Sequence, residues 1–150
     1  MSSLYALGMT STPLHGRLSD ISSTGVSHSD AQWQPIRNHF GLTAFGINAY
    51  TARSVGDVII GEHDHADPDD EQHQELYFVH AGRARFTVDG EMFDAPAGTF
   101  VSVPDVRTKR SAVAEEANTV ILVIGAEAGA AFEVTPAERA ELAGAGFALR

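Results

Sequence analysis

The sequence predicts an all-β fold, a sandwich or barrel, because short strand-like runs separated by turn signals fill the middle of the chain. Residues 83–88 alternate polar and apolar side chains and meet Asp89-Gly90, a strong signal for a two-residue hairpin turn. Residues 91–94 then return as the partner strand. Residues 120–124 are all apolar, which is typical of a strand buried on both faces.

Further strands are expected at residues 43–51, 57–65, 75–81 and 99–103, and one helix is expected near the C-terminal end. That helix has Thr135 as N-cap, Pro136 at its first position, Glu138 at its third and Gly144 to close it. We therefore divide the chain into an irregular N-terminal arm (1–30), a β-barrel domain (31–134) and a short C-terminal helix and tail (135–150).

Size and composition indicate one globular domain and exclude several kinds of site. The chain has 150 residues, 43% of them hydrophobic, and no cysteine, so disulfides, thiolate metal sites and cysteine nucleophiles are excluded. Its formal net charge is −10 with no basic run, which argues against nucleic acid and anionic membranes as partners. No apolar stretch approaches the ~20 residues that span a bilayer, and the first residues lack the features of a secretory signal. We expect a cytoplasmic protein.

The segment 62–75 is the strongest functional signal in the sequence. It holds three histidines and seven acidic residues, and imidazole nitrogen and carboxylate oxygen suit Zn, Fe, Mn, Ni and Cu. His63 and His65 are two residues apart, so on a strand they share a face, as do His73 and Glu75. We predict a divalent metal ion held by His63, His65 and Glu75, with His73 as the alternative to His65.

At this point the sequence resembles the cupin superfamily, small jelly-roll barrels whose first motif is a His-x-His pair, a Glu a few residues later and a Gly after six more. His63-Asp64-His65 supplies the pair, and six residues separate Glu75 from Gly82. The gap of nine residues between His65 and Glu75 is longer than the family's pattern, which a surface loop tolerates at modest entropic cost. The resemblance covers residues 43–125 and implies an RmlC-like cupin, a double-stranded β-helix (jelly-roll barrel).

The second cupin motif is incomplete. Gly98 and Pro104 have the family's spacing, but Val106 stands in place of a Gly, and Lys109 in place of the His that is usually the fourth metal ligand. A protonated lysine has no lone pair for a metal. Three alternatives stay open. The metal has three protein ligands, or the site is metal-free and Lys109 neutralises Glu75, or the alignment is shifted and Lys109 points outward among Arg107 and Arg110.

Two functions from different classes follow. The first is a small-molecule-binding cupin with a metal inside the barrel. As the resemblance implies, it would act as a dioxygenase, isomerase or decarboxylase on a small organic substrate, with Lys109 and Tyr77 as candidate catalytic residues. The second is a non-catalytic ligand-binding or sensing cupin with a degenerate, metal-free site.

The strand at 75–81 also suggests a homodimer. Leu76 and Phe78 face away from Glu75 and Tyr77, so this strand is apolar on both faces and must be covered twice. A second subunit or the N-terminal arm would cover the outer face.

Overall fold

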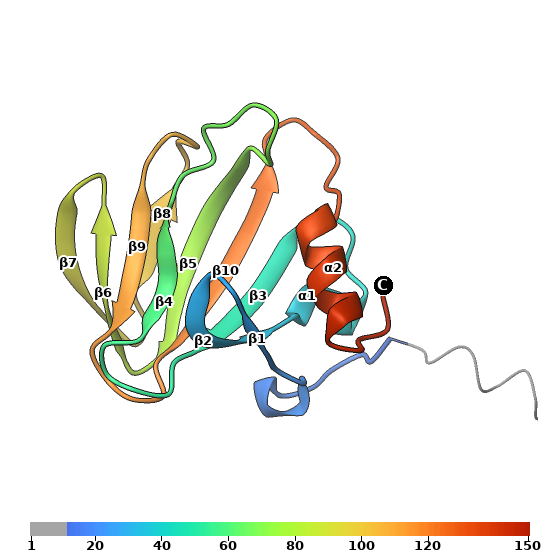
Figure 1. Cartoon of the computed structure of the whole chain (residues 1–150), viewed down its shortest axis with the longest axis horizontal. Coiled ribbons are helices and arrows are strands. Elements are labelled where there is room, and N and C mark those ends of the chain that lie inside the picture. The colour runs from blue at the N-terminus through green and yellow to red at the C-terminus, as the bar shows by residue number, and fades with distance from the viewer. Residues whose placement is uncertain (1–11) are drawn as a thin grey trace, which may run out of the picture.

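Ten antiparallel strands form two facing sheets in this computed structural model, which describes residues 12–150 (Figure 1). The six-stranded sheet has the order β1 (Thr24–Val26), β2 (Ser29–Gln34), β3 (Gly46–Thr51), β10 (Val120–Glu127), β5 (His73–Ala81) and β8 (Phe100–Val103). The four-stranded sheet has the order β4 (Val58–His63), β9 (Arg110–Ala114), β6 (Arg83–Val88) and β7 (Glu91–Pro96). The predicted all-β jelly-roll is confirmed.

Alternation along the strands builds the core between the sheets. Tyr77 and Val79 on β5, Phe86 on β6 and Ile121 on β10 are fully buried, whereas Phe78 and Arg85, which lie between such positions, turn toward the outside. Residues two apart share a face, so each strand gives one row of side chains to the core. The predicted hairpin joins β6 to β7 through Asp89 and Gly90, both with positive φ, as the two-residue turn requires.

Gly82 follows β5 and has a φ of +74°. A Cβ at this position would collide with Thr119, whose hydroxyl bonds both the amide and the carbonyl of Arg83. The glycine of the first motif is therefore needed for backbone conformation and for close packing.

Three short helices complete the described chain: η1 (Leu18–Asp20), α1 (Ile36–Phe40) and α2 (Pro136–Gly144). None of the helices within residues 12–150 is long and apolar enough to cross a membrane. The Thr135 side chain caps α2 by accepting from the Glu138 amide, as predicted. The fully buried Arg37 of α1 bonds Glu138 and the Arg150 carbonyl, so α2 and the tail are held beside β3 (Figure 1).

The structure differs from the expected elements in several places. Strand β4 ends at His63, so His65 lies in the following loop and not on the strand expected at residues 57–65, and α1 was not expected. The expected division at residue 30 falls inside β2, because β1 and β2 form a hairpin that extends the large sheet. Strand β9 was not expected, since Ala112 and Ala114 give its inner face little apolar bulk. The first ten residues of the expected arm and Ser11 lie outside the described residues.

Candidate metal centre and cavity

The predicted ligands come together where the two sheets face each other. His63 is the last residue of β4 in the small sheet, His65 follows in the loop, and Glu75 lies on β5 in the large sheet. Two hydrogen bonds hold this loop in place. The His65 amide donates to the Val106 carbonyl at 2.7 Å, and the Gln72 side chain donates to the His65 carbonyl at 2.7 Å.

His63, His65 and Glu75 each offer one donor atom, and these three atoms lie within 4.8 Å of one another. His65 Nε2 bonds Glu75 Oε1 directly, and His63 Nε2 lies 3.6 Å from the same oxygen. His63 Nδ1 donates to the Gly61 carbonyl at 2.8 Å, which leaves Nε2 as the atom with a lone pair for a metal. Two imidazoles and a carboxylate form a set that binds divalent transition metals.

His73 lies next to this group and outside it. Its ring centroid is 6.1 Å from that of His65 and 5.8 Å from that of Phe132, and its Nδ1 lies 3.6 Å from the Glu71 carboxylate. His65, the first choice of the sequence analysis, belongs to the set of three. His73, the alternative, instead forms the side of the cavity next to it.

Lys109 is exposed, and the next residue, Arg110, is the one that points inward. Arg110 is fully buried, and it lies in register with His63 on β4 and Val88 on β6, so these three share a face of the sheet. Its Nη2 lies 3.5 Å from Glu75 Oε1. Of the three alternatives for Lys109, the structure therefore has the outward one. The motif alignment put the inward-facing position at Lys109, one residue too early. The guanidinium of Arg110 lies where the family has its fourth ligand.

Tyr77 lies below the site as a fully buried residue, and its hydroxyl accepts from Arg110 Nε at 3.2 Å. Burial raises the pKa of Tyr77 first, and the neighbouring Glu75 carboxylate raises it further, so the phenol stays neutral. It therefore acts as a hydrogen-bonding support for Arg110 and Glu75.

The site keeps Glu75 ionised. Burial alone would raise its pKa, but interactions with His63, His65 and Tyr77 outweigh burial and hold the pKa of Glu75 well below its usual range. For His63, burial lowers the pKa, but the Glu75 carboxylate and the Gly61 carbonyl more than compensate, so its pKa is raised. A buried carboxylate surrounded by an arginine and imidazoles is a compensated charge, not an isolated one.

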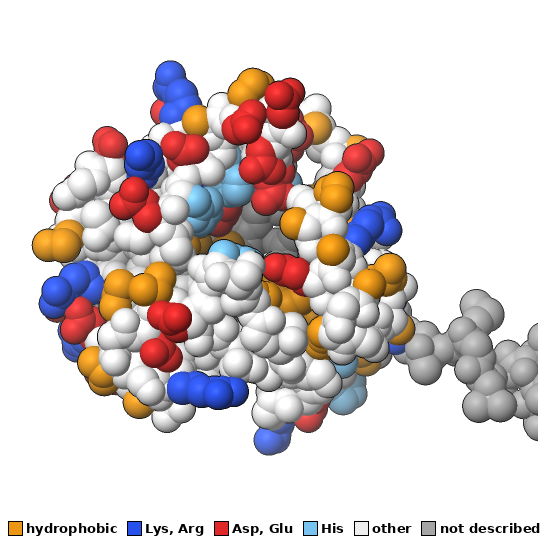
Figure 2. Space-filling model, viewed as in Figure 1, with side chains coloured by type: hydrophobic (Ala, Val, Ile, Leu, Met, Phe, Trp, Pro, Cys, Tyr) orange, Lys and Arg blue, Asp and Glu red, His pale blue; other side chains and the backbone are white. Residues whose placement is uncertain are grey.

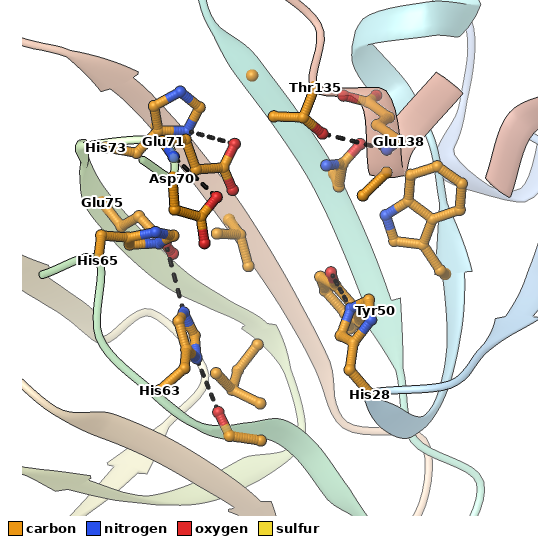
Figure 3. A pocket seen from close by; sticks show the side chains of 18 of the residues that line it. His28, Tyr50, His63, His65, Asp70, Glu71, His73, Glu75, Thr135 and Glu138 are labelled. Atoms are coloured by element: carbon orange, nitrogen blue, oxygen red, sulfur yellow. Dashed lines mark hydrogen bonds and ion pairs between the residues drawn. The ribbon is translucent and has the colours of Figure 1, made fainter. Parts of the chain in front are cut away.

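A cavity of about 700 Å³ opens beside this group and reaches across to α2. Figure 2 shows the opening as a hollow rimmed by histidine and acidic side chains. In Figure 3 the His63, His65 and Glu75 side chains stand on one wall, and His28, Tyr50, Thr135 and Glu138 on the other. The cavity is continuous because Gly46, Gly125 and Glu75 lie in register across three adjacent strands, so two of these positions carry no side chain.

The far wall has residues that the sequence analysis did not single out. His28 lies in the β1–β2 turn, with Nε2 3.2 Å from the Tyr50 hydroxyl and Nδ1 3.7 Å from Glu141 on α2. These residues, like Arg110, come from segments far apart in the sequence. Only the alternation of Arg110, Ala112 and Ala114 could have indicated an inward arginine, and small side chains make that a weak signal.

Comparison with known proteins identifies the fold. No protein-family model and no curated protein sequence matches this chain. Among solved structures, a sugar phosphate isomerase from a cupin superfamily, from Silicibacter pomeroyi, is similar with a TM-score of 0.59, 15% identity and coverage of 74% of each chain. A predicted oxalate decarboxylase from Thermotoga maritima has a TM-score of 0.58 and 16% identity, over 73% of this chain and 95% of the other.

A third similar structure, from Acidithiobacillus ferrooxidans, has a TM-score of 0.53 and 22% identity over 63% of this chain. The chain spans 58% of that protein's length. At these identities the likeness concerns the architecture.

Proposed function

Because the chain has the fold of the cupin superfamily, we propose that it binds a divalent metal ion through His63, His65 and Glu75 and a small organic molecule in the adjacent cavity. The observation that carries the proposal is the meeting of three donor atoms within 4.8 Å at the wall of a cavity of about 700 Å³. Pockets of several hundred Å³ are the usual size of small-molecule sites.

The residues present fit such an ion. All three donors are nitrogen or oxygen atoms, and the His65 Nδ1 is buried without a hydrogen-bond partner among the described residues. His63 is oriented by the Gly61 carbonyl, and Glu75 is kept ionised by its neighbours. His65 and Glu75 are hydrogen-bonded to each other, and a bound ion would replace the proton that they share.

His63, His65 and Glu75 would hold the ion, which would supply Lewis-acid polarisation of a carbonyl or hydroxyl oxygen of a bound molecule. The chain's own residues do the rest. Tyr77 and Arg110 contact each other behind Glu75 and hold it in place, and the loop 64–72 adds Asp69, Asp70 and Glu71 to the cavity wall. On the opposite wall the Tyr50 hydroxyl faces the cavity as a neutral hydrogen-bonding group, because burial and then Glu141 raise its pKa. This arrangement supports a metal-dependent enzyme of isomerase, decarboxylase or dioxygenase type.

The experiment is elemental analysis of the chain purified from metal-replete medium, in parallel with a His63→Ala/Glu75→Ala double variant. We expect about one equivalent of a divalent metal in the wild type and an affinity lower by more than about 100-fold in the variant. Glu141→Gln is the matched control, because it removes a cavity carboxylate from the other wall. Less than a tenth of an equivalent in the wild type would refute the metal proposal.

One observation favours the second candidate, a metal-free binding cupin. Arg110 brings a permanent positive charge to within 3.5 Å of the ligand carboxylate, where it competes with a cation for Glu75. If the metal analysis is negative, this guanidinium explains it, and the cavity is then a binding site without catalysis. Ligand-induced thermal stabilisation that survives a chelator is the expected result for that case.

The homodimer stays a proposal, now with a more definite surface. Leu76, Phe78, Phe100 and Leu122 lie side by side on the outer face of the large sheet. The Phe78 and Phe100 rings pack with centroids 4.5 Å apart, and Phe100 is 63% exposed. We propose that a second copy covers this face. Light scattering should give the dimer mass for the wild type and the monomer mass for Phe100→Glu, and a monomeric wild type would contradict the proposal.

A further inference from the structure

We propose that the molecule bound in the cavity is a small organic cation, whose ammonium group lies against α2 while its polar end points to the wall of His63 and His65. This inference rests on the proposed function in taking the cavity as a ligand site. It goes beyond that function by naming the chemical class of the ligand, and it does not require the metal.

The charges that line the cavity carry the argument. Carboxylates enter from both sides, namely Asp69, Asp70, Glu71 and Glu75 around the β4–β5 loop and Glu138 and Glu141 from α2. Within residues 12–150, no lysine or arginine lines this cavity. Walls of one sign focus their potential into the space between them, so an anion is excluded and a cation is concentrated.

The internal partners of these carboxylates leave part of the charge uncompensated. Glu75 faces Arg110, and Glu138 lies 3.3 Å from Arg37, so both are paired with permanent cations behind the wall. Among the described residues, Glu141 forms an ion pair with His28 alone, at 3.7 Å. Glu71 likewise forms one with His73 alone in this part of the chain, at 3.6 Å, and a histidine is a cation only when it is protonated.

The pKa of Tyr50 reflects these charges. Its hydroxyl lies beside His28 on the wall opposite His63 and His65 (Figure 3), and its pKa is raised by burial first and then by carboxylates of both walls, Glu141, Glu75, Glu138 and Glu71. The pKa of Glu141 is itself raised, by burial first and by Glu138, against the opposing effect of His28. The potential is therefore negative where a ligand would sit.

Unpaired acceptors point to a hydrogen-bond donor as the missing partner. His65 is only 7% exposed and lines the cavity. In the metal-free protein its Nε2 proton faces Glu75, so its buried Nδ1 is an acceptor without a donor among the described residues. The Asn48 Oδ1, also on a lining residue, is a second buried acceptor without a hydrogen-bond partner in residues 12–150. In the same part of the chain, the buried donors without a hydrogen-bond partner belong to Arg37 and Arg110, which do not line the cavity.

Aromatic faces complete the site for a cation. Trp33 and Tyr50 line the same cavity, and Trp33 is 2% exposed, so its ring is shielded from bulk water. A cation over a desolvated aromatic ring is attracted by the ring quadrupole. An anion such as a phosphate ester or a carboxylate would meet the Glu138 and Glu141 carboxylates on the α2 side.

The test uses three probes of nearly the same shape and different charge: choline, its neutral isostere 3,3-dimethyl-1-butanol, and the anion 3,3-dimethylbutanoate. Binding is followed by calorimetry and by the fluorescence of Trp33, the single tryptophan of the chain. Each titration is done with metal-free protein and with Zn²⁺ added. We expect choline to bind about 10-fold more tightly than the alcohol, and the difference to shrink with added salt.

Glu141→Gln locates the effect on the α2 wall. It should reduce choline affinity by roughly 3- to 5-fold and leave the affinity of the alcohol unchanged. Glu91→Gln, an exposed carboxylate outside the cavity, is the control and should change neither. Glu138 is left intact in this test, because its loss would also leave the buried Arg37 without its partner.

In the metal-free protein, equal affinities for choline and the alcohol, tighter binding of the anion, or no binding of choline at about 10 mM would overturn the inference. Its failure is distinguishable from that of the proposed function. Metal binding together with a preference for the alcohol removes only the cation. Absence of metal together with choline selectivity in the metal-free protein removes only the metal.

Discussion

Glu75 and Glu141 line one cavity from opposite walls, and their surroundings affect their ionisation in opposite ways. Glu75 has two imidazoles, a guanidinium and a phenol around it, and its pKa is held well below the usual range. Glu141 has one half-exposed histidine and another carboxylate nearby, and its pKa is raised, mainly by burial. The negative charge of Glu75 is thus neutralised by neighbouring side chains of the protein, whereas the charge of Glu141 is left to interact with a ligand.

Arg110→Met tests the wall that contains Glu75 and should give the largest loss of stability. Removing one partner of a buried ion pair costs about 3–5 kcal/mol of unfolding free energy, because Glu75 loses its permanent cation. Zn²⁺ should restore much of the lost stability, since the ion replaces the missing positive charge. Chemical denaturation with and without Zn²⁺ measures both.

Arg107→Met is the matched control, an exposed arginine whose partner Asp105 is also in solvent, and it should change stability little. Equal stability of Arg110→Met and the wild type without metal would show that Glu75 does not depend on this pair. Charge compensation at Glu75 and at Glu141 would then differ less than their neighbouring side chains indicate.

Thr135→Ala tests the α2 wall with an intermediate effect. The Thr135 hydroxyl accepts from the Glu138 amide at the start of α2, and loss of such a cap costs about 1 kcal/mol. We expect faster hydrogen exchange confined to α2 and weaker choline binding, with metal content unchanged. A drop in bound metal would contradict the separate roles of the walls.

The pH dependence of Glu141→Gln should give the smallest effect. Folding raises the pKa of Glu141, so the folded protein holds this proton more tightly than the unfolded chain does. The free energy of unfolding therefore falls as the pH rises through that pKa. Replacement by glutamine should therefore stabilise the protein at pH 7 relative to pH 4, by on the order of 1–2 °C in Tm because the site is partly in solvent. Thermal melts of both proteins at the two pH values measure the difference, and the opposite sign would mean that His28 dominates.

The sequence allowed one wall to be predicted and not the other, for a physical reason. His63, His65 and Glu75 lie within one short segment, so their spacing singles them out in the sequence, although β4 ends at His63 and His65 lies in the loop that follows. His28, Tyr50 and Glu141 meet only because the β1–β2 turn, β3 and α2 are brought together by tertiary packing, and Arg37 does much of that from a buried position. No local pattern encodes such a meeting.

The same distinction explains the error at Lys109. The spacing of the second motif placed the inward side chain one residue too early, and β9 lacks the bulky alternation that would have fixed its register. The pairing of Arg110 with His63 and Val88 decides which residue faces inward, and that pairing is non-local.

The row formed by Gly46, Gly125 and Glu75 sets how far one wall can influence the other. A methyl group added at Gly125 would stand 3.3 Å from the Glu75 Cγ, and one at Gly46 would stand 3.4 Å from the Phe132 ring. The change at Gly46 would narrow the passage without touching a charged group, whereas the change at Gly125 would also press on Glu75. The width of the passage between the two walls therefore depends on the absence of a side chain at Gly46 and Gly125, and this width limits the length of a molecule that can bind to both walls at once.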